Sequence, residues 1–140
     1  MAWHWFRSKA RNPTPRLELG ERGEDFAARF LRHRGYKILV RRFKSRGGEI
    51  DIVCRDRDWL VFVEVKTRVT DQLGAPSESV QRDKQRHLSK AALDYLRLLD
   101  NPRIRWRFDI VEVLLRKEAR KPDDLRLIPN AFDLSEPYIY

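Results

Sequence analysis

The sequence predicts a single α/β domain in which helices pack on one mixed β-sheet. A chain of 140 residues has the usual length of one domain. Its apolar content of 41% and aromatic content of 11% are typical of a globular chain rather than of a disordered one. The apolar residues recur in the order helix, three strands, helix, strand and a further short strand. This order is typical of a mixed sheet that is covered by helices.

The first helix is expected over residues 17–34, where apolar residues recur at helical spacing. The stripe consists of Gly20, Gly23, Ala27, Phe30 and Leu31. Glu24 lies on the same stripe. A carboxylate that is buried without a partner is strongly destabilising or becomes protonated, so Glu24 is a candidate functional residue.

Three strands are expected next, at residues 36–43, 49–54 and 59–67. The sequence Arg46-Gly47-Gly48 marks the first turn between them. Connections this short join antiparallel neighbours. The three strands are therefore expected to form an antiparallel meander.

The second half of the chain is expected to add a loop, a helix and two strands. These elements are assigned to residues 69–78, 79–99, 104–115 and 125–129, in that order. The apolar stripe of the helix is expected to extend to Leu99. The last strand is expected at an edge of the sheet with Pro129 at its end, because proline cannot donate to a strand ladder.

We expect the domain to span residues 17–129. Residues 1–16 form a basic tail with several aromatic residues. This tail is expected to be a disordered arm, and stacking on nucleic-acid bases is the alternative. Residues 130–140 are expected to be a C-terminal extension.

The positive charge of the chain is concentrated near its beginning. Residues 1–48 contain thirteen Lys and Arg residues against four Asp and Glu residues, and so carry the whole net charge of +9. Segment 29–46 contains eight cations and no acid. A face that only aids solubility does not need so many, and the cations do not share one amphipathic helix, as a membrane surface would favour. The charge therefore favours a partner with a phosphate backbone.

Several functional classes are excluded by what the chain lacks. Its single cysteine, Cys54, rules out a disulfide framework and a cysteine zinc site. The three histidines have no ligand spacing, which argues against a zinc hydrolase. No apolar run reaches the roughly 18 residues of a membrane span, and no secretory signal is evident. We therefore expect a soluble cytoplasmic protein with no membrane partner.

Charged residues interrupt the second and third expected strands. Alternate residues of a strand face one side, so Asp51 and Val53 are expected on one face and Ile50 and Ile52 on the other. In the third strand, Glu64 interrupts an apolar run typical of a central strand that is buried on both sides. The strands are joined by a short turn, so the Asp51 and Glu64 carboxylates can lie side by side.

Two adjacent carboxylates need a proton or a cation between them. Mg²⁺ or Mn²⁺ suits such a pair, because Mg²⁺ takes hard oxygen ligands and pairs naturally with phosphate. Lys66 shares the face of Glu64 and can orient a water or stabilise negative charge. Glu24 can reach the same site, directly or through water, and Lys84 can face it from the second helix. The alternative is a simple Glu64–Lys66 ion pair with Asp51 as a surface acid.

At these residues the sequence resembles the YraN-like family of bacterial proteins. The motifs that carry the resemblance are Gly20-Glu21-x-Gly23-Glu24, Gly47-Gly48-Glu49-Ile50-Asp51-Ile52-Val53, Val63-Glu64-Val65-Lys66-Thr67-Arg68, Lys84 and Arg107-Phe108-Asp109-Ile110-Val111. That family is similar to the PD-(D/E)xK nuclease superfamily, with a restriction-endonuclease-like fold close to that of archaeal Holliday junction resolvases.

The resemblance implies metal ligands at Asp51 and Glu64, a catalytic lysine at Lys66 and an auxiliary acid at Glu24. Ile50 replaces the superfamily's nominal proline, and the RecB-like Gln-x-x-x-Tyr signature is absent. Asp109 interrupts another apolar run, where it can anchor the sheet or support the site.

The sequence thus predicts a metal-dependent endonuclease that hydrolyses phosphodiester bonds in branched or structured DNA, with DNA favoured over RNA. The backbone phosphates are expected to contact Arg41, Arg42, Lys44, Arg46, Arg68 and Lys84. A homodimer would suit symmetric substrates. The alternatives are a non-catalytic nucleic-acid-binding module with a nuclease-like fold and an interaction protein whose basic face meets acidic partners.

Overall fold

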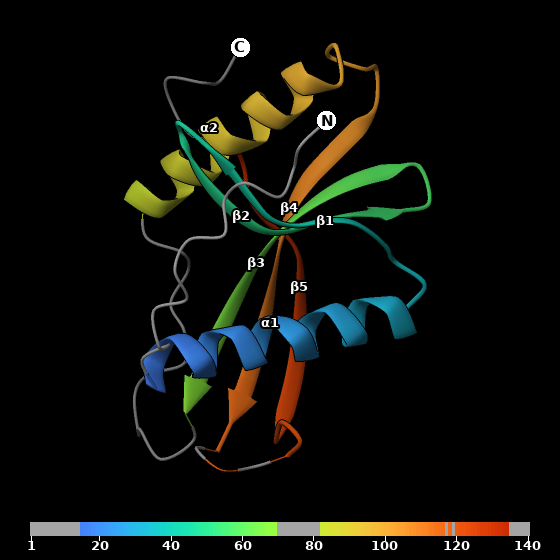
Figure 1. Cartoon of the computed structure of the whole chain (residues 1–140). Coiled ribbons are helices and arrows are strands. Elements are labelled where there is room, and N and C mark those ends of the chain that lie inside the picture. Colours follow the sequence, from blue (N-terminus) through green and yellow to red (C-terminus); the bar gives the residue numbers. More distant parts are fainter. Residues whose placement is uncertain (1–14, 70–81, 117, 119, 135–140) are drawn as a thin grey trace, which may run out of the picture.

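The computed structural model describes residues 15–69, 82–116, 118 and 120–134. The elements follow the predicted order (Figure 1): α1 (Pro15–His33), β1 (Lys37–Ser45), β2 (Gly48–Asp56), β3 (Trp59–Val69), α2 (Arg82–Leu98), β4 (Arg105–Leu115) and β5 (Asp124–Phe132). The predicted single α/β domain is confirmed. Among the described residues, no helix is long and apolar enough to cross a membrane.

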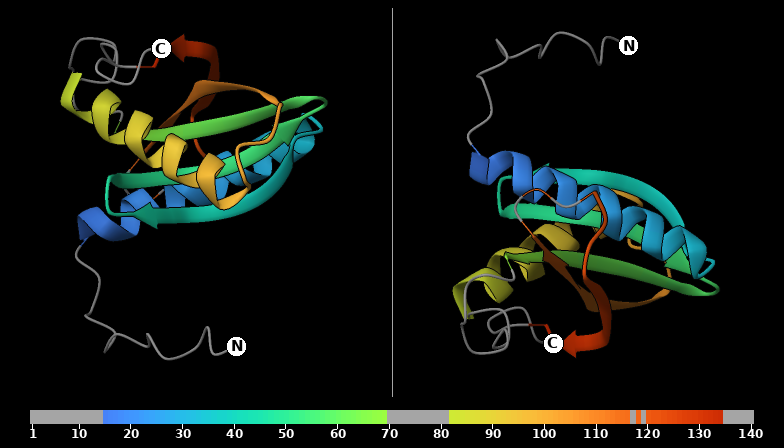
Figure 2. Two further views of the ribbon diagram at one scale, coloured as in Figure 1. Left: turned by 90° about the horizontal axis from the view of Figure 1, so that it is seen from above. Right: turned by 90° about the horizontal axis from the view of Figure 1, so that it is seen from below.

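The five strands form one mixed sheet in the order β1-β2-β3-β4-β5. The pairs β1–β2 and β2–β3 are antiparallel, which confirms the expected meander of the first three strands. The pair β4–β5 is also antiparallel. The pair β3–β4 is parallel and requires a crossover connection, of which α2 is a part. The two helices cover opposite faces of the sheet (Figure 2). This arrangement is consistent with a restriction-endonuclease-like fold.

Each helix buries a hydrophobic cluster against its own face of the sheet. Under α2 the cluster contains Ile50, Val53, Phe62 and Phe108 together with the apolar face of the helix. Under α1 a second cluster contains Ile52, Cys54, Val61, Val63 and Val111 with Ala27, Ala28 and Leu31 of the helix. The central strand β3 contributes to both clusters, as its apolar run predicts.

The prediction that Ile50 and Ile52 share a face is wrong. Ile50 packs with Val53 under α2, whereas Ile52 packs under α1. The alternation is interrupted in β1 at the same place, because Val40 and Phe43 both pack against the α2 cluster. Arg42, which lies between them, has a φ of +55°, a conformation that side chains other than glycine rarely adopt.

Other differences concern the ends of elements. Leu99 lies beyond the end of α2 and is 46% exposed, so the predicted extension of the apolar stripe is wrong. The last strand continues past Pro129, which lies inside β5, to Phe132. The edge position of β5 explains how the strand tolerates the proline. Most of the predicted tail and all of the predicted loop except Val69 lie outside the described residues.

Candidate active site

Asp51 and Glu64 lie where β2 and β3 separate. The ladder between these strands ends at the pair Ile52↔Val63, after which β2 follows β1 and β3 follows β4 (Figure 1). At this point Oδ2 of Asp51 accepts a hydrogen bond of 2.8 Å from the backbone N–H of Val65. The side chain thus satisfies a backbone donor that the β2–β3 ladder no longer reaches. Both acidic residues therefore lie just beyond the point at which the β2–β3 ladder ends.

The two carboxyl groups are close enough to perturb each other. Burial raises the pKa of Asp51 to about 8, and the negative charge of Glu64 and a hydrogen bond with it contribute to the rise. The hydrogen bond from Val65 acts in the opposite direction. Glu64 is only 4% exposed. The site therefore requires a proton or a cation to hold the two groups together.

Lys84 of α2 supplies one such cation, because its Nζ forms an ion pair with Oε1 of Glu64. Desolvation lowers the pKa of Lys84, but the hydrogen bond and the charge of Glu64, together with the charges of Asp51 and Glu49, raise it above its ordinary value. The side chain of Lys84 is 59% exposed. It reaches from the rim of α2 to the buried carboxylate, so the expectation that Lys84 faces the site agrees with its position.

Lys66 lies on the same strand face as Glu64 and is half-buried. Desolvation lowers its pKa, and the neighbouring cations Arg68 and Lys84 lower it further, whereas Glu112 and Glu64 raise it. The ammonium group is thus influenced by two acids, Glu112 and Glu64, and by two cations. A lysine in such a position is suited to contact an anion next to the carboxylates.

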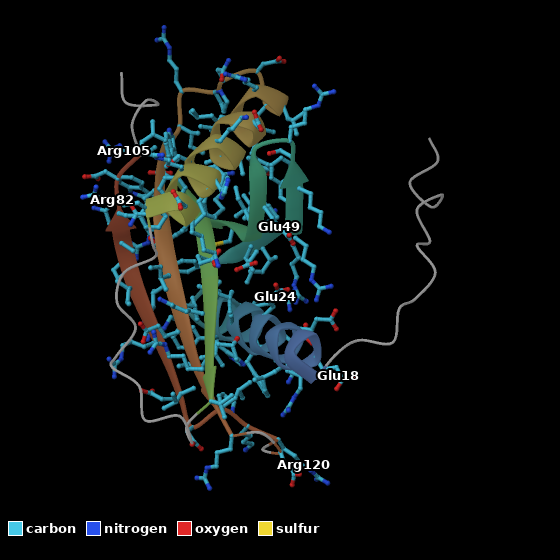
Figure 3. All side chains as sticks on the ribbon, turned by 90° about the vertical axis from the view of Figure 1, so that its left-hand side faces the viewer. Glu18, Glu24, Glu49, Arg82, Arg105 and Arg120 are labelled. Carbon is cyan, nitrogen blue, oxygen red and sulfur yellow. The ribbon has the colours of Figure 1, made fainter. Side chains whose placement is uncertain are left out.

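Glu24 approaches the site from α1. Gly23 lets the helix lie close to β3, because a Cβ built on Gly23 would come within 1.8 Å of Oγ1 of Thr67. Nε of Arg42 donates a hydrogen bond of 2.8 Å to Oε2 of Glu24, whose side chain is 16% exposed. Glu24 projects from α1 toward the β1–β2 hairpin (Figure 3), and its charge contributes to the raised pKa of Asp51.

The residues present fit a hard divalent cation. Asp51 and Glu64 offer carboxylate oxygens, and within the described part of the chain no group of three or more His, Cys, Asp and Glu residues is placed to hold a metal. A structural zinc site, with four protein ligands, is therefore a poor fit here. Mg²⁺ is commonly held by one or two carboxylates, with waters and substrate phosphates completing its coordination.

The predicted phosphate-binding cations of the β1–β2 hairpin fall into two groups. Arg41 and Arg42 of β1 are engaged by acids of α1: Arg41 donates a hydrogen bond of 2.7 Å to Asp25, and Arg42 binds Glu24. Lys44 and Arg46 are exposed, and no ion pair joins them to an acid among the residues described. Arg68 is half-buried on β3. The structure thus separates the exposed end of the hairpin from a paired region next to α1.

An open cleft of about 620 Å³ lies between the β1–β2 turn and the first half of α2. It is lined by Ser45, Arg46, Gly47, Gly48, Glu49, Asp83, Lys84, His87 and Leu88. Sequence reasoning missed this cleft and interpreted Gly47-Gly48 only as a turn. The two glycines also permit close packing, because a Cβ at Gly48 would lie 2.7 Å from the carbonyl oxygen of His87. The Lys84 side chain therefore lines the cleft and also reaches Glu64.

Asp109 anchors the sheet. It is fully buried, accepts a hydrogen bond of 3.0 Å from Nε of Arg107 and accepts another of 2.9 Å from the backbone N–H of Asn130. Arg107 also contacts Asp56 and Tyr36. These bonds link β4 to β2, to β5 and to the residue before β1, so the structural interpretation of Asp109 agrees with its contacts.

Comparison with known proteins identifies related chains that match most of the length of this one. The model of "Uncharacterised protein family UPF0102" matches residues 23–113. A UPF0102 protein of Syntrophus aciditrophicus is 43% identical over 122 residues, which are 87% of this chain and 94% of that protein. A UPF0102 protein of Geobacter sulfurreducens is 46% identical over 119 residues, or 84% and 90% of the two chains. One from Chlorobaculum tepidum is 47% identical over 96 residues, or 69% and 74%.

Proposed function

The chain belongs to uncharacterised protein family UPF0102, the YraN-like family that its motifs predict, and we propose that it is a metal-dependent endonuclease acting on DNA in the cytoplasm. Branched or structured DNA is the proposed substrate. The observation that carries this proposal is the pair of Asp51 and Glu64 carboxyls, brought together in a separation of two core strands. Burying two like charges is unfavourable unless a proton or a cation joins them.

Each residue of the site has a proposed role. Asp51 and Glu64 hold Mg²⁺ or Mn²⁺, which supplies Lewis-acid stabilisation of phosphate and lowers the pKa of bound water. Lys66 contacts the substrate phosphate or the attacking water and stabilises negative charge. Glu24 acts as an auxiliary acid beside Asp51. Lys84 neutralises Glu64 when no metal is present.

The nucleic acid is proposed to lie along the exposed end of the β1–β2 hairpin and the cleft beside α2. Lys44 and Arg46 on the hairpin are available to its phosphates, and Arg46 also lines the cleft. The cleft leads to Lys84, whose ammonium contacts Glu64. A backbone held along this path therefore passes next to the acidic pair.

Cleavage of labelled four-way junction, linear duplex and single-stranded DNA, with and without Mg²⁺, tests the proposal. We expect nicking that requires the metal and is lost in both Glu64→Ala and Lys66→Ala. Arg120→Ala, which removes an exposed cation beyond β4, is the control and is expected to cleave normally. If the wild-type protein and both site variants share the same background, the enzyme is refuted.

A non-catalytic nucleic-acid-binding module is the second candidate. The observation that favours it is the Lys84–Glu64 ion pair, because an internal cation can satisfy the buried carboxylate without metal. Binding of DNA whose logarithmic affinity falls linearly with the logarithm of salt concentration, with no cleavage in Mg²⁺ or Mn²⁺, would support this candidate over the enzyme.

A further inference from the structure

Arg42 has an unusual backbone conformation at an unusual place. Its φ of +55° lies in the left-handed region, which is disfavoured for residues with a Cβ. In the β1–β2 ladder, Arg42 lies between the pairs Arg41↔Ile52 and Phe43↔Ile50, directly across from Asp51. Left-handed residues are found where the surrounding structure compensates for their strain, and they cluster at functional sites.

The side chain of Arg42 points to α1. Its Nε donates a hydrogen bond of 2.8 Å to Oε2 of Glu24, and its Nη1 lies 3.7 Å from Oε1 of Glu21. Arg41 completes the network, with Nη2 at 2.7 Å from Oδ1 of Asp25 and 3.9 Å from Oε2 of Glu24. Two arginines of β1 thus bind three acids on one face of α1.

Glu24 lies on the side of α1 that faces β1, where its partner Arg42 lies across the ladder from Asp51. The charge of Glu24 contributes to the raised pKa of Asp51, as does the charge of Glu64. Without a partner, the Glu24 side chain would rotate into solvent, where a carboxylate is well hydrated. The hydrogen bond from Arg42 opposes that rotation, and charge-assisted bonds of this type are among the stronger ones in proteins.

We propose that Arg42 is a positioning residue that holds Glu24 beside Asp51, and that it does not contact the nucleic acid. This inference rests on the proposed function, because Glu24 is useful there only if the acidic pair binds metal. Groups that orient the surroundings of a metal typically change its affinity by about 10- to 100-fold when they are removed. Because Arg42 donates its short hydrogen bond to Glu24, whereas Glu21 lies farther away at 3.7 Å, we expect Arg42 to act on the metal through Glu24.

Titration with Mn²⁺, followed by calorimetry without DNA, tests this role. We expect Arg42→Ala and Glu24→Gln each to weaken binding by about tenfold, and the double variant to bind no more weakly than Glu24→Gln. Arg42→Gly is the folding control, because glycine adopts a positive φ without strain. It is expected to fold well and still to bind Mn²⁺ about tenfold more weakly. Wild-type affinity in Arg42→Gly, or additive losses in the double variant, would overturn the role.

The salt dependence of DNA binding tests the second half of the proposal. We expect Arg46→Ala to reduce the slope of log affinity against log salt by about 0.9, the value for one lost phosphate contact, and Arg42→Ala to leave the slope unchanged. Equal reductions in both variants would show that Arg42 binds phosphate and would refute the inference alone. A wild-type protein that binds neither Mn²⁺ nor DNA would instead refute the proposed function together with it.

Discussion

Replacing Gly23 by alanine should separate α1 from β3. An alanine Cβ would lie 1.8 Å from Oγ1 of Thr67 and 3.0 Å from its Cβ and Cγ2. Rotation of Thr67 can remove the first contact, but its Cβ stays too close. Overpacking of this kind typically destabilises by about 1–3 kcal/mol. This loss of stability is partly offset by the better helix propensity of alanine, which contributes about 1 kcal/mol.

Gly20 provides the matched reference, because a Cβ on Gly20 meets nothing within 4 Å. Gly20→Ala should therefore stabilise the protein by about 0.5–1 kcal/mol. The difference in unfolding free energy between the two variants should be about 1–3 kcal/mol. Urea unfolding followed by tryptophan fluorescence measures it. In the Gly23→Ala protein, Thr67→Ala should recover only the part of the loss that comes from Oγ1 and Cγ2, because the Cβ of residue 67 remains. Equal stability of the two alanine variants would refute the close packing that brings Glu24 to the site.

Three further predictions follow from buried charges. The Lys84→Met variant should bind Mn²⁺ about fivefold more tightly than the wild type, because the substitution removes a competing ion pair worth about 1 kcal/mol. The control Lys90→Met, on the same helix, should bind Mn²⁺ with wild-type affinity, and calorimetry compares the two variants. Because burial raises the pKa of Asp51 to about 8, metal binding at pH 7 must displace a proton. The affinity for Mn²⁺ should therefore rise about tenfold per pH unit and level off above pH 8. Calorimetry in buffers of different ionisation enthalpy measures the proton release. Asp109→Asn removes one of the two acids that pair with Arg107, while Asp56 remains, and should lower the unfolding free energy, measured in urea, by about 1–3 kcal/mol.

The central part of the fold was predictable because local patterns and tertiary packing agree there. An apolar run that is interrupted by Glu64 predicts β3 as a strand buried on both faces, and its residues do contribute to both clusters. Glu64 is conspicuous in the sequence for the same reason: a charge in such a run must have a partner. The short turns predict the meander, and the meander places Asp51 next to Glu64.

The roles of the β1 arginines were not predictable from local sequence. Arg41 and Arg42 belong to a run of cations without acids, which favours a phosphate-binding surface. Their partners lie 16 and 18 residues earlier in the chain, and only the packing of α1 beside β1 brings the charges together. The positive φ of Arg42 likewise has no signal in the sequence. The exchange of faces at Ile50 therefore escaped an interpretation based on strict alternation.

The binding of a divalent cation by the Asp51–Glu64 pair tests the central claim most directly. The measurement is a Mn²⁺ titration of the wild-type protein and of Glu64→Gln at pH 8.5, followed by electron paramagnetic resonance. The proposed site predicts saturable binding by the wild-type protein, with the affinity reduced by more than about tenfold in Glu64→Gln. Equal binding by the two proteins, or no binding by the wild type at millimolar Mn²⁺, would contradict the assignment of this pair as a metal site.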